Sequence, residues 1–194
     1  MAPMPLVILD RDGVINEDSA DFIKSLAEWI PIPGSIKAIA RLSRAGFTVV
    51  VATNQSGLGR GLFTVEDLDA MHLRLSSLVE ESGGRLSGIY YCPHRPDEGC
   101  DCRKPAPGLL DAISRDLGIE LHNAVIVGDS LRDLQAGLAR GCEPILVRTG
   151  KGADTEASLR AAGNPLVQSL KVFDSLQSCA DYLIARCTST RKPH

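Results

Sequence analysis

The sequence lacks the features that direct a protein to membranes or nucleic acids. Its 194 residues contain no apolar stretch long enough to cross a bilayer and no basic segment followed by an apolar one at the N-terminus, so we expect a cytoplasmic protein with no membrane partner. It has no run of Lys and Arg, and its net charge of −3 gives no electrostatic reason to expect a nucleic-acid partner. It also has no heptad pattern, and we expect a monomer.

Internal repeats, low-complexity blocks and linkers are missing as well. Apolar residues make up 44% of the chain, which is enough to bury a core in a domain of this length. We therefore expect a single domain over residues 1–187. The polar residues 188–194 follow it, and we expect them to form a disordered tail.

Short apolar runs alternate with amphipathic patterns along most of the chain. Strands buried on both faces, as in the middle of a parallel sheet, are expected at residues 6–9, 47–52, 87–91, 124–127 and 144–147. Helices are expected at residues 35–45, 64–82, 107–117, 131–140 and 175–185. Loops are expected at residues 16–33 and, with one helical turn, at 150–165. This alternation predicts an α/β fold, a Rossmann-like parallel sheet with helices on both faces.

Polar residues stand at the ends of three of these strands. Asp10 and Asp12 follow the first strand, Thr53 and Asn54 the second, and Asp129 the fourth. Because the carboxyl ends of parallel strands meet at one edge of a sheet, these side chains should converge in one crevice. Two acids one residue apart repel each other unless a cation or a proton lies between them, which favours a divalent metal. A solvated, Asp-rich turn is the alternative for the first pair.

A second cluster combines cysteine with histidine, and its members are Cys92, His94, Cys100 and Cys102. Three thiolates and one imidazole fit tetrahedral Zn²⁺, and because no position is left for water the site would be structural. Zinc would fold a loop that has few apolar residues and fix Arg103 and Lys104, which follow directly. The alternative is a group of free cysteines beside an unrelated histidine.

The motifs, taken in order, resemble those of the haloacid dehalogenase superfamily of phosphotransferases. They are Asp10-x-Asp12-Gly13, Thr53-Asn54, Lys104-Pro105 and Gly128-Asp129-x-x-x-Asp133. Each is weak alone, but the ordered set is specific and covers residues 6–148. The segments between the motifs are too short for a separate cap domain, so the resemblance implies a capless haloacid dehalogenase fold with a zinc-binding loop. Its pocket would be walled by residues 16–24, 55–62 and 92–103.

The resemblance also implies how the acidic residues would act. Asp10 would attack phosphorus and form an aspartyl-phosphate that water later hydrolyses. Asp12 would protonate the leaving oxygen and then remove a proton from that water. Mg²⁺ would be held by Asp10, Asp129 and the main-chain carbonyl of Asp12, an oxygen-only set that suits this ion.

Other residues would support this chemistry. The resemblance implies that Thr53 and Lys104 stabilise the oxygens of the transferring phosphoryl group. Asp133 lies one helical turn beyond Asp129; it would orient Lys104 or the waters of the metal, or else be a helix-surface acid. His72, in a predicted helix, and His122, in a predicted loop, are expected to be structural or solvated.

Three longer runs extend the motifs, at residues 10–16, 53–61 and 100–108. They resemble capless, zinc-containing phosphatases that act on small metabolites. Such enzymes act on a sugar bisphosphate or on histidinol phosphate, and Ser56 together with the Arg60-Gly61 pair favours the sugar substrate. An alternative from another class is a non-catalytic, zinc-stabilised interaction module. The complete set of catalytic residues argues against that module.

The resemblance implies contacts between a small sugar phosphate and nine residues: Arg11, Asp18, Ser19, Ala20, Asp21, Asn54, Gln55, Ser56 and Arg103. Arg103 would bind the distal phosphate, because a guanidinium matches two phosphate oxygens. The sequence departs from the common pattern at residues 18–21 and at Ser130, where Lys often follows the acid. Both departures touch the pocket.

Overall fold

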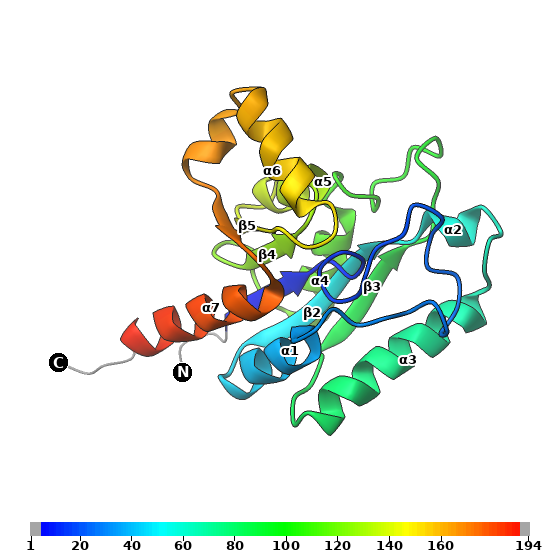
Figure 1. Ribbon diagram of the computed structural model, residues 1–194, viewed down its shortest axis with the longest axis horizontal. Coiled ribbons are helices and arrows are strands. Elements are labelled where there is room, and N and C mark those ends of the chain that lie inside the picture. Colours follow the sequence, from blue (N-terminus) through cyan, green and yellow to red (C-terminus); the bar gives the residue numbers. More distant parts are fainter. Residues whose placement is uncertain (1–4, 191–194) are drawn as a thin grey trace.

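The chain folds around one six-stranded parallel sheet (Figure 1). The structure is a computed structural model that describes residues 5–190. The strands are β1 (Leu6–Leu9), β2 (Thr48–Asn54), β3 (Gly88–Cys92), β4 (Val125–Gly128), β5 (Glu143–Val147) and β6 (Lys171–Phe173). Across the sheet they lie in the order β3-β2-β1-β4-β5-β6. The helices are α1 (Ser35–Arg44), α2 (Ser56–Gly59), α3 (Val65–Glu81), α4 (Gly108–Leu117), α5 (Leu131–Leu138), α6 (Gly152–Ala161), α7 (Leu176–Thr190) and the 3-10 helix η1 (Pro165–Gln168).

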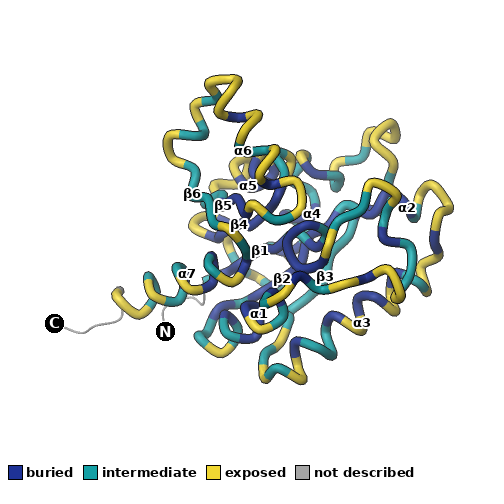
Figure 2. Tube along the Cα trace, in the orientation of Figure 1, coloured by how far each residue is buried: buried dark blue, intermediate teal, exposed yellow. Residues whose placement is uncertain are grey.

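Helices cover both faces of the sheet, which confirms the predicted fold class (Figure 1). In β1, Val7 and Leu9 contribute to one core and Leu6 and Ile8 to the other, and none of the four is more than 2% exposed. Residues of α1, α3 and α7 complete the first core, and residues of α4 and α5 complete the second. The central strands are accordingly the most buried part of the trace (Figure 2). A strand apolar on both sides is stable only between two such layers.

Two elements after residue 150 differ from the prediction. Residues 152–161 form the ten-residue helix α6 rather than one turn within a loop, and β6 adds a sixth strand at the edge of the sheet. In α6 only Gly152 and Leu159 are buried, so the segment lacks the apolar periodicity on which a helix prediction depends. Strand β6 has three residues, all half-buried, and is too short to give a clear pattern.

Smaller differences occur at the element ends. Strand β2 runs on through Thr53 and Asn54, and a short helix, α2, interrupts the loop expected at 55–62. Helix α7 continues to Thr190, so residues 188–190 are not the start of a disordered tail, and residues 191–194 lie outside the described part. Helix α3 begins after a capping box formed by Thr64 and Asp67, which agrees with the helix expected from residue 64.

The predicted loop over the strand ends, residues 16–33, is tied to the body of the protein. Asn16 forms isolated bridges with Asp12 and Pro31, and the side chains of Ile23 and Trp29 enter the first core. This anchoring holds the loop beside the carboxyl edge of the sheet. Within residues 5–190, no helix is long and apolar enough to span a membrane.

Candidate active site

The carboxyl ends of β1, β2 and β4 meet at a cavity of about 270 Å³. Its lining includes the predicted residues Asp10, Asp12, Asp18, Ser19, Ala20, Thr53, Asn54, Gln55, Ser56, Arg103, Lys104 and Asp129. Residues far apart in sequence are therefore brought together by the parallel order of the strands, as expected for an open α/β sheet.

Lys104 occupies the floor of this cavity and is only 2% exposed. Its Nζ lies 2.9 Å from Oδ1 of Asp10 and 2.6 Å from Oδ1 of Asp133, and it donates a hydrogen bond to the main-chain carbonyl of Ala52. Burial alone would lower the pKa of Lys104, but the charges of Asp10 and Asp133 raise it above its usual value. Lys104 therefore remains a cation, and Asp133 is a buried partner that orients it rather than a helix-surface acid.

The cavity also gathers three carboxylates, those of Asp10, Asp129 and Asp133, whose ligand atoms lie within 4.8 Å of one another. Burial raises the pKa of Asp10 to about 8, with a further contribution from the charge of Asp133, and burial raises the pKa of Asp129 to about 6. A divalent cation at this position would reverse both shifts by favouring the ionised carboxylates. Both oxygens of Asp133 are occupied, Oδ1 by Lys104 and Oδ2 by Ser130. Asp10 and Asp129 each accept hydrogen bonds from the described residues on one oxygen only, so each has an oxygen available to a cation.

Asp129 is fixed by two loops that close tightly around it. Its Oδ2 accepts a hydrogen bond from the main-chain N–H of Lys151 (2.8 Å), and Oγ1 of Thr149 donates to the carbonyl of Gly13 (2.7 Å). Gly13 and Gly150 both have positive φ, +84° and +58°, and a Cβ on either would collide with Oδ2 of Asp129. Glycine is required at both positions by conformation and by space.

Asp12 is held by side chains on several sides. Its Oδ1 accepts hydrogen bonds from Nε of Arg11 (3.0 Å) and Nδ2 of Asn16 (2.8 Å), and its Oδ2 accepts one from Nε2 of Gln55 (2.8 Å). The same Nε2 donates to Oγ1 of Thr53 (2.9 Å), which leaves the Thr53 hydroxyl proton free to donate toward the cavity. Asp12 remains 21% exposed, so it is accessible to a ligand.

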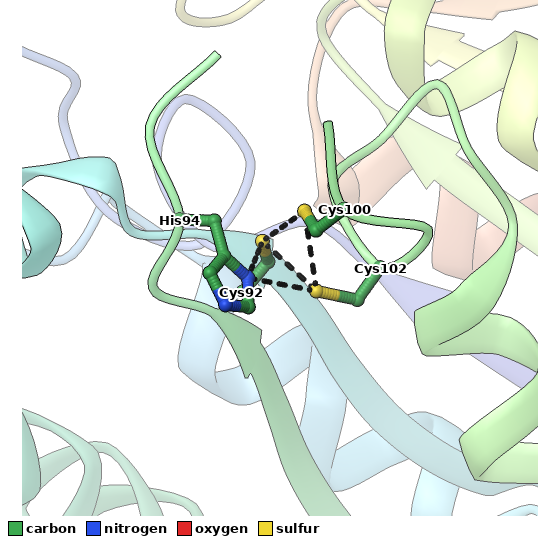
Figure 3. A group of neighbouring side chains, drawn as sticks. All are labelled: Cys92, His94, Cys100 and Cys102. Carbon is green, nitrogen blue, oxygen red and sulfur yellow. Dashed lines mark hydrogen bonds between the residues drawn. The ribbon is translucent and has the colours of Figure 1, made fainter. Parts of the chain in front are cut away.

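The side chains of Cys92, His94, Cys100 and Cys102 are brought together as predicted (Figure 3), and Arg103, which lines the cavity, follows the cluster directly. Nδ1 of His94 lies 3.2 Å from Sγ of Cys102, and the three sulfurs lie 3.2–3.6 Å apart. Tetrahedral zinc with bonds of about 2.3 Å to sulfur would separate two sulfurs by about 3.8 Å. The four ligand atoms thus have the arrangement that a tetrahedral ion needs.

One wall of the cavity is cationic. Arg60, Arg103 and Arg132 all line it, and none forms an ion pair with a residue that the structure describes. Burial lowers the pKa of Arg103, and the charges of Arg132 and Arg60 lower it further. NH1 of Arg103 donates to the main-chain carbonyl of His94 (3.3 Å), so the cysteine–histidine loop positions this arginine.

Two of the predicted substrate contacts do not fit the structure. The side chain of Arg11 is 0% exposed and turned away from the cavity, and Asp21 is exposed outside the lining. Arg11 lies at a bend just after the end of β1, and its side chain is buried against Asp12 and His72.

The cavity has further lining residues that were not among the predicted contacts: Phe22, Ile23, Arg60, Pro96, Ser130, Arg132, Asp133 and Lys151. Most come from loops, whose paths leave no periodic signal in the sequence. Phe22, Ile23, Arg60 and Pro96 nevertheless lie in the segments expected to wall the pocket, and Ser130 is a position expected to touch it.

Comparison with known proteins gives the same family throughout. The family model described as HAD-hydrolase-like matches residues 101–173. A D-glycero-β-D-manno-heptose-1,7-bisphosphate 7-phosphatase from Pseudomonas aeruginosa is 55% identical, over 92% of this chain and 97% of that protein.

Solved structures agree with this result. A D,D-heptose 1,7-bisphosphate phosphatase from B. bronchiseptica, complexed with magnesium and phosphate, has a TM-score of 0.87 at 48% identity and covers 94% of this chain and 99% of its own. The corresponding structure from Burkholderia thailandensis has a TM-score of 0.68 at 43% identity, with 92% and 98% coverage. The haloacid dehalogenase fold predicted from the motifs is confirmed.

Replacing Gly150 with alanine tests the packing around Asp129. Gly150→Ala should weaken Mg²⁺ binding, because the new Cβ must displace the Asp129 carboxylate. The measurement is the Mg²⁺ concentration that gives half of the maximal rise in thermal stability. Gly163→Ala is the matched control, since Gly163 has a similar φ of +60° and open space around it. Both variants should lose about 1 kcal/mol of folding free energy from the positive φ. Equal Mg²⁺ titrations for the two would contradict the role given to Gly150.

Proposed function

Because the chain belongs to the D-glycero-β-D-manno-heptose-1,7-bisphosphate 7-phosphatase family of HAD-like hydrolases, we propose that it removes the 7-phosphate of D-glycero-β-D-manno-heptose 1,7-bisphosphate. The observation that carries this proposal is one cavity that holds a phosphatase residue set on its floor and three unpaired guanidinium groups on its wall. A sugar with a phosphate at each end matches that division of charge. We assign the reaction to the synthesis of ADP-heptose for the lipopolysaccharide core.

The floor supports hydrolysis in two steps. An oxygen of Asp10 attacks phosphorus, and the bond from phosphorus to the sugar oxygen breaks as Asp12 donates a proton to that oxygen. Water then attacks the aspartyl-phosphate while Asp12 accepts the proton of the water, which releases phosphate and restores Asp10. Thr53 and Lys104 donate hydrogen bonds to the phosphoryl oxygens during both steps.

Magnesium is the metal that fits this floor. Asp10, Asp129 and the main-chain carbonyl of Asp12 would hold it, and when bound it neutralises the charge of the phosphoryl group and of the attacking carboxylate. The hard oxygen donors exclude a thiolate-preferring ion from this position. The magnesium and phosphate in the B. bronchiseptica structure support the assignment.

The wall accounts for selection of a bisphosphate. Arg103 is half-buried and anchored to the loop of the cysteine–histidine cluster, and we assign to it the contact with the distal phosphate. Arg60 and Arg132 add positive charge to the lining of the same cavity. Histidinol phosphate, the alternative substrate, carries an ammonium group that this wall would repel.

We also propose that Cys92, His94, Cys100 and Cys102 bind a structural Zn²⁺. Four ligands leave no position for water, and the loop from 93 to 101 has no buried apolar side chain to hold it in place. The ion would fix the conformation of Arg103 and Lys104, which follow directly. Zinc would thus shape the cavity by holding this loop in place, without contacting the substrate.

A panel of phosphate esters tests the proposed activity. With Mg²⁺ present, we expect the highest kcat/KM for the β-anomer of the heptose bisphosphate, and lower values for its α-anomer, fructose 1,6-bisphosphate and histidinol phosphate. Asp10→Asn should lower kcat by about 10⁴-fold or more, because it removes the nucleophile at constant shape. Preference for histidinol phosphate would contradict the substrate, and wild-type inactivity on every ester would favour a non-catalytic module.

Removal of zinc tests the cysteine–histidine cluster. Cys100→Ser should lower the zinc content and the midpoint of thermal unfolding, and should raise KM for the bisphosphate more than for a simple aryl phosphate, because Arg103 loses its anchor. Cys187→Ser is the control, since this cysteine lies outside the cluster, and its zinc content should match the wild type. Full zinc content in Cys100→Ser would refute the ligand set.

A further inference from the structure

Arg11 is the largest fully buried side chain of the molecule as described, and it is a cation. It follows the nucleophile Asp10 directly, yet its guanidinium points away from the cavity and into the side of the protein covered by α3. A buried charge is strongly unfavourable unless it is paired and hydrogen-bonded. The partners of Arg11 therefore indicate what it does.

Those partners are Asp12 and His72. Nε of Arg11 donates to Oδ1 of Asp12 (3.0 Å) and NH2 lies 2.9 Å from the same oxygen and 3.2 Å from Oδ2, so the guanidinium fork spans the carboxylate. The remaining arm, NH1, lies 3.3 Å from Nε2 of His72 on α3. The guanidinium thus connects the general acid–base of the proposed reaction to a buried helix residue.

The chemistry of this contact assigns the state of His72. Arginine has only donors, so Nε2 of His72 must be the acceptor and the proton of the neutral ring must lie on Nδ1. Burial lowers the pKa of His72 to about 4, and the charge of Arg11 lowers it further against a smaller opposite effect of Asp12. The ring also contacts that of Tyr91, with the two ring centroids 5.9 Å apart.

We propose that His72 and Arg11 are positioning residues for Asp12: His72 holds the guanidinium in register, and the guanidinium holds the Asp12 carboxylate in the rotamer from which it transfers a proton in the cavity. The proposal rests on the proposed function, because it assumes that Asp12 is the general acid and base. Neither residue touches the substrate. Asn16 and Gln55 restrain the same carboxylate, but they approach from the loop and from the end of β2.

A role limited to filling the core would not need this geometry. The first core around His72 is otherwise apolar, with Met71 and Leu75 beside it on α3, and an apolar side chain would pack there without burying a charge. Arg11 has no carboxylate partner besides Asp12 among the described residues. Positioning of the Asp12 carboxylate explains why Arg11 and His72 are both buried here.

The test exploits the dependence of proton donation on the leaving group. An alkyl leaving oxygen, as in the heptose bisphosphate, needs a proton as it departs, whereas p-nitrophenolate does not. In single turnovers with enzyme in excess, quenched with acid, His72→Leu should slow phosphoryl-enzyme formation from the bisphosphate about tenfold. Formation from p-nitrophenyl phosphate should change less than about twofold. Breakdown of the phosphoryl-enzyme should slow equally for both esters, because the intermediate is the same.

Two further variants separate positioning from stability. His72→Gln places an amide oxygen near NH1 of Arg11 and should restore most of the rate lost in His72→Leu. Leu75→Val disturbs the packing of the same helix without a polar contact, and should slow both esters alike if it slows either. If His72→Leu does not fold, Arg11→Lys serves in its place, since it keeps the charge and loses the fork.

The outcomes distinguish this inference from the proposed function. Equal losses in the rate of phosphoryl-enzyme formation from the two esters, or equal formation rates for His72→Leu and His72→Gln, would overturn the positioning role and leave the proposed phosphatase activity intact. Wild-type activity on fructose 1,6-bisphosphate but not on the heptose ester would refute the substrate, and fructose 1,6-bisphosphate would then serve as the alkyl ester. A wild type inactive on all esters would refute both.

Discussion

The buried ammonium group of Lys104 is the interaction on which the rest of the site depends. It lies between Asp10 and Asp133, and without it these acids would face each other in a buried cavity with only repulsion between them. Its backbone is held by the side-chain amide of Asn54, which donates to the Lys104 carbonyl and accepts from the Lys104 N–H, both at 3.0 Å. The end of β2 therefore fixes a residue that lies fifty positions later in the chain.

The balance of charge explains why the cavity suits phosphoryl transfer. One lysine cannot compensate Asp10, Asp129 and Asp133 together. Burial raises the pKa values of Asp10 and Asp129, and the charge of Asp133 adds to both shifts. A divalent cation supplies the missing charge, and a phosphate bound next to it restores the anionic partner for the cation and for Lys104. The uncompensated arginines on the wall then act at the other end of the substrate. Each part of the cavity is incomplete without a ligand of the proposed kind.

The sequence predicted those features that local patterns encode. The apolar runs located five strands, and the position of Asp10, Asp129 and Lys104 after strands or before a helix predicted their convergence, which follows from the topology of a parallel sheet. The cysteine–histidine spacing predicted a compact cluster, because four ligands within eleven positions form a closed loop. These inferences need only the order of the elements.

Features that depend on packing could not be predicted in this way. Helix α6 buries little more than Leu159, so no apolar stripe marks it. Arg132, in the first turn of α5, and Lys151, at the start of α6, reach the cavity from positions that no apolar pattern singles out. The family resemblance implies a substrate contact for Arg11. Its side chain is instead buried and does not line the cavity. His72, expected to be structural or solvated, is its buried partner. Only the three-dimensional structure reveals which way such side chains point.

The central claim is that Asp10 becomes covalently phosphorylated, and the most direct measurement is to locate the phosphoryl group. A single turnover with the heptose bisphosphate and Mg²⁺ is quenched in acid, and the protein is digested and analysed by tandem mass spectrometry. The account predicts a phosphoryl group on the peptide that contains Asp10, removed by hydroxylamine as an acyl phosphate must be. Phosphate release without any such adduct, at quench times that span the turnover, or an adduct on another residue would contradict it.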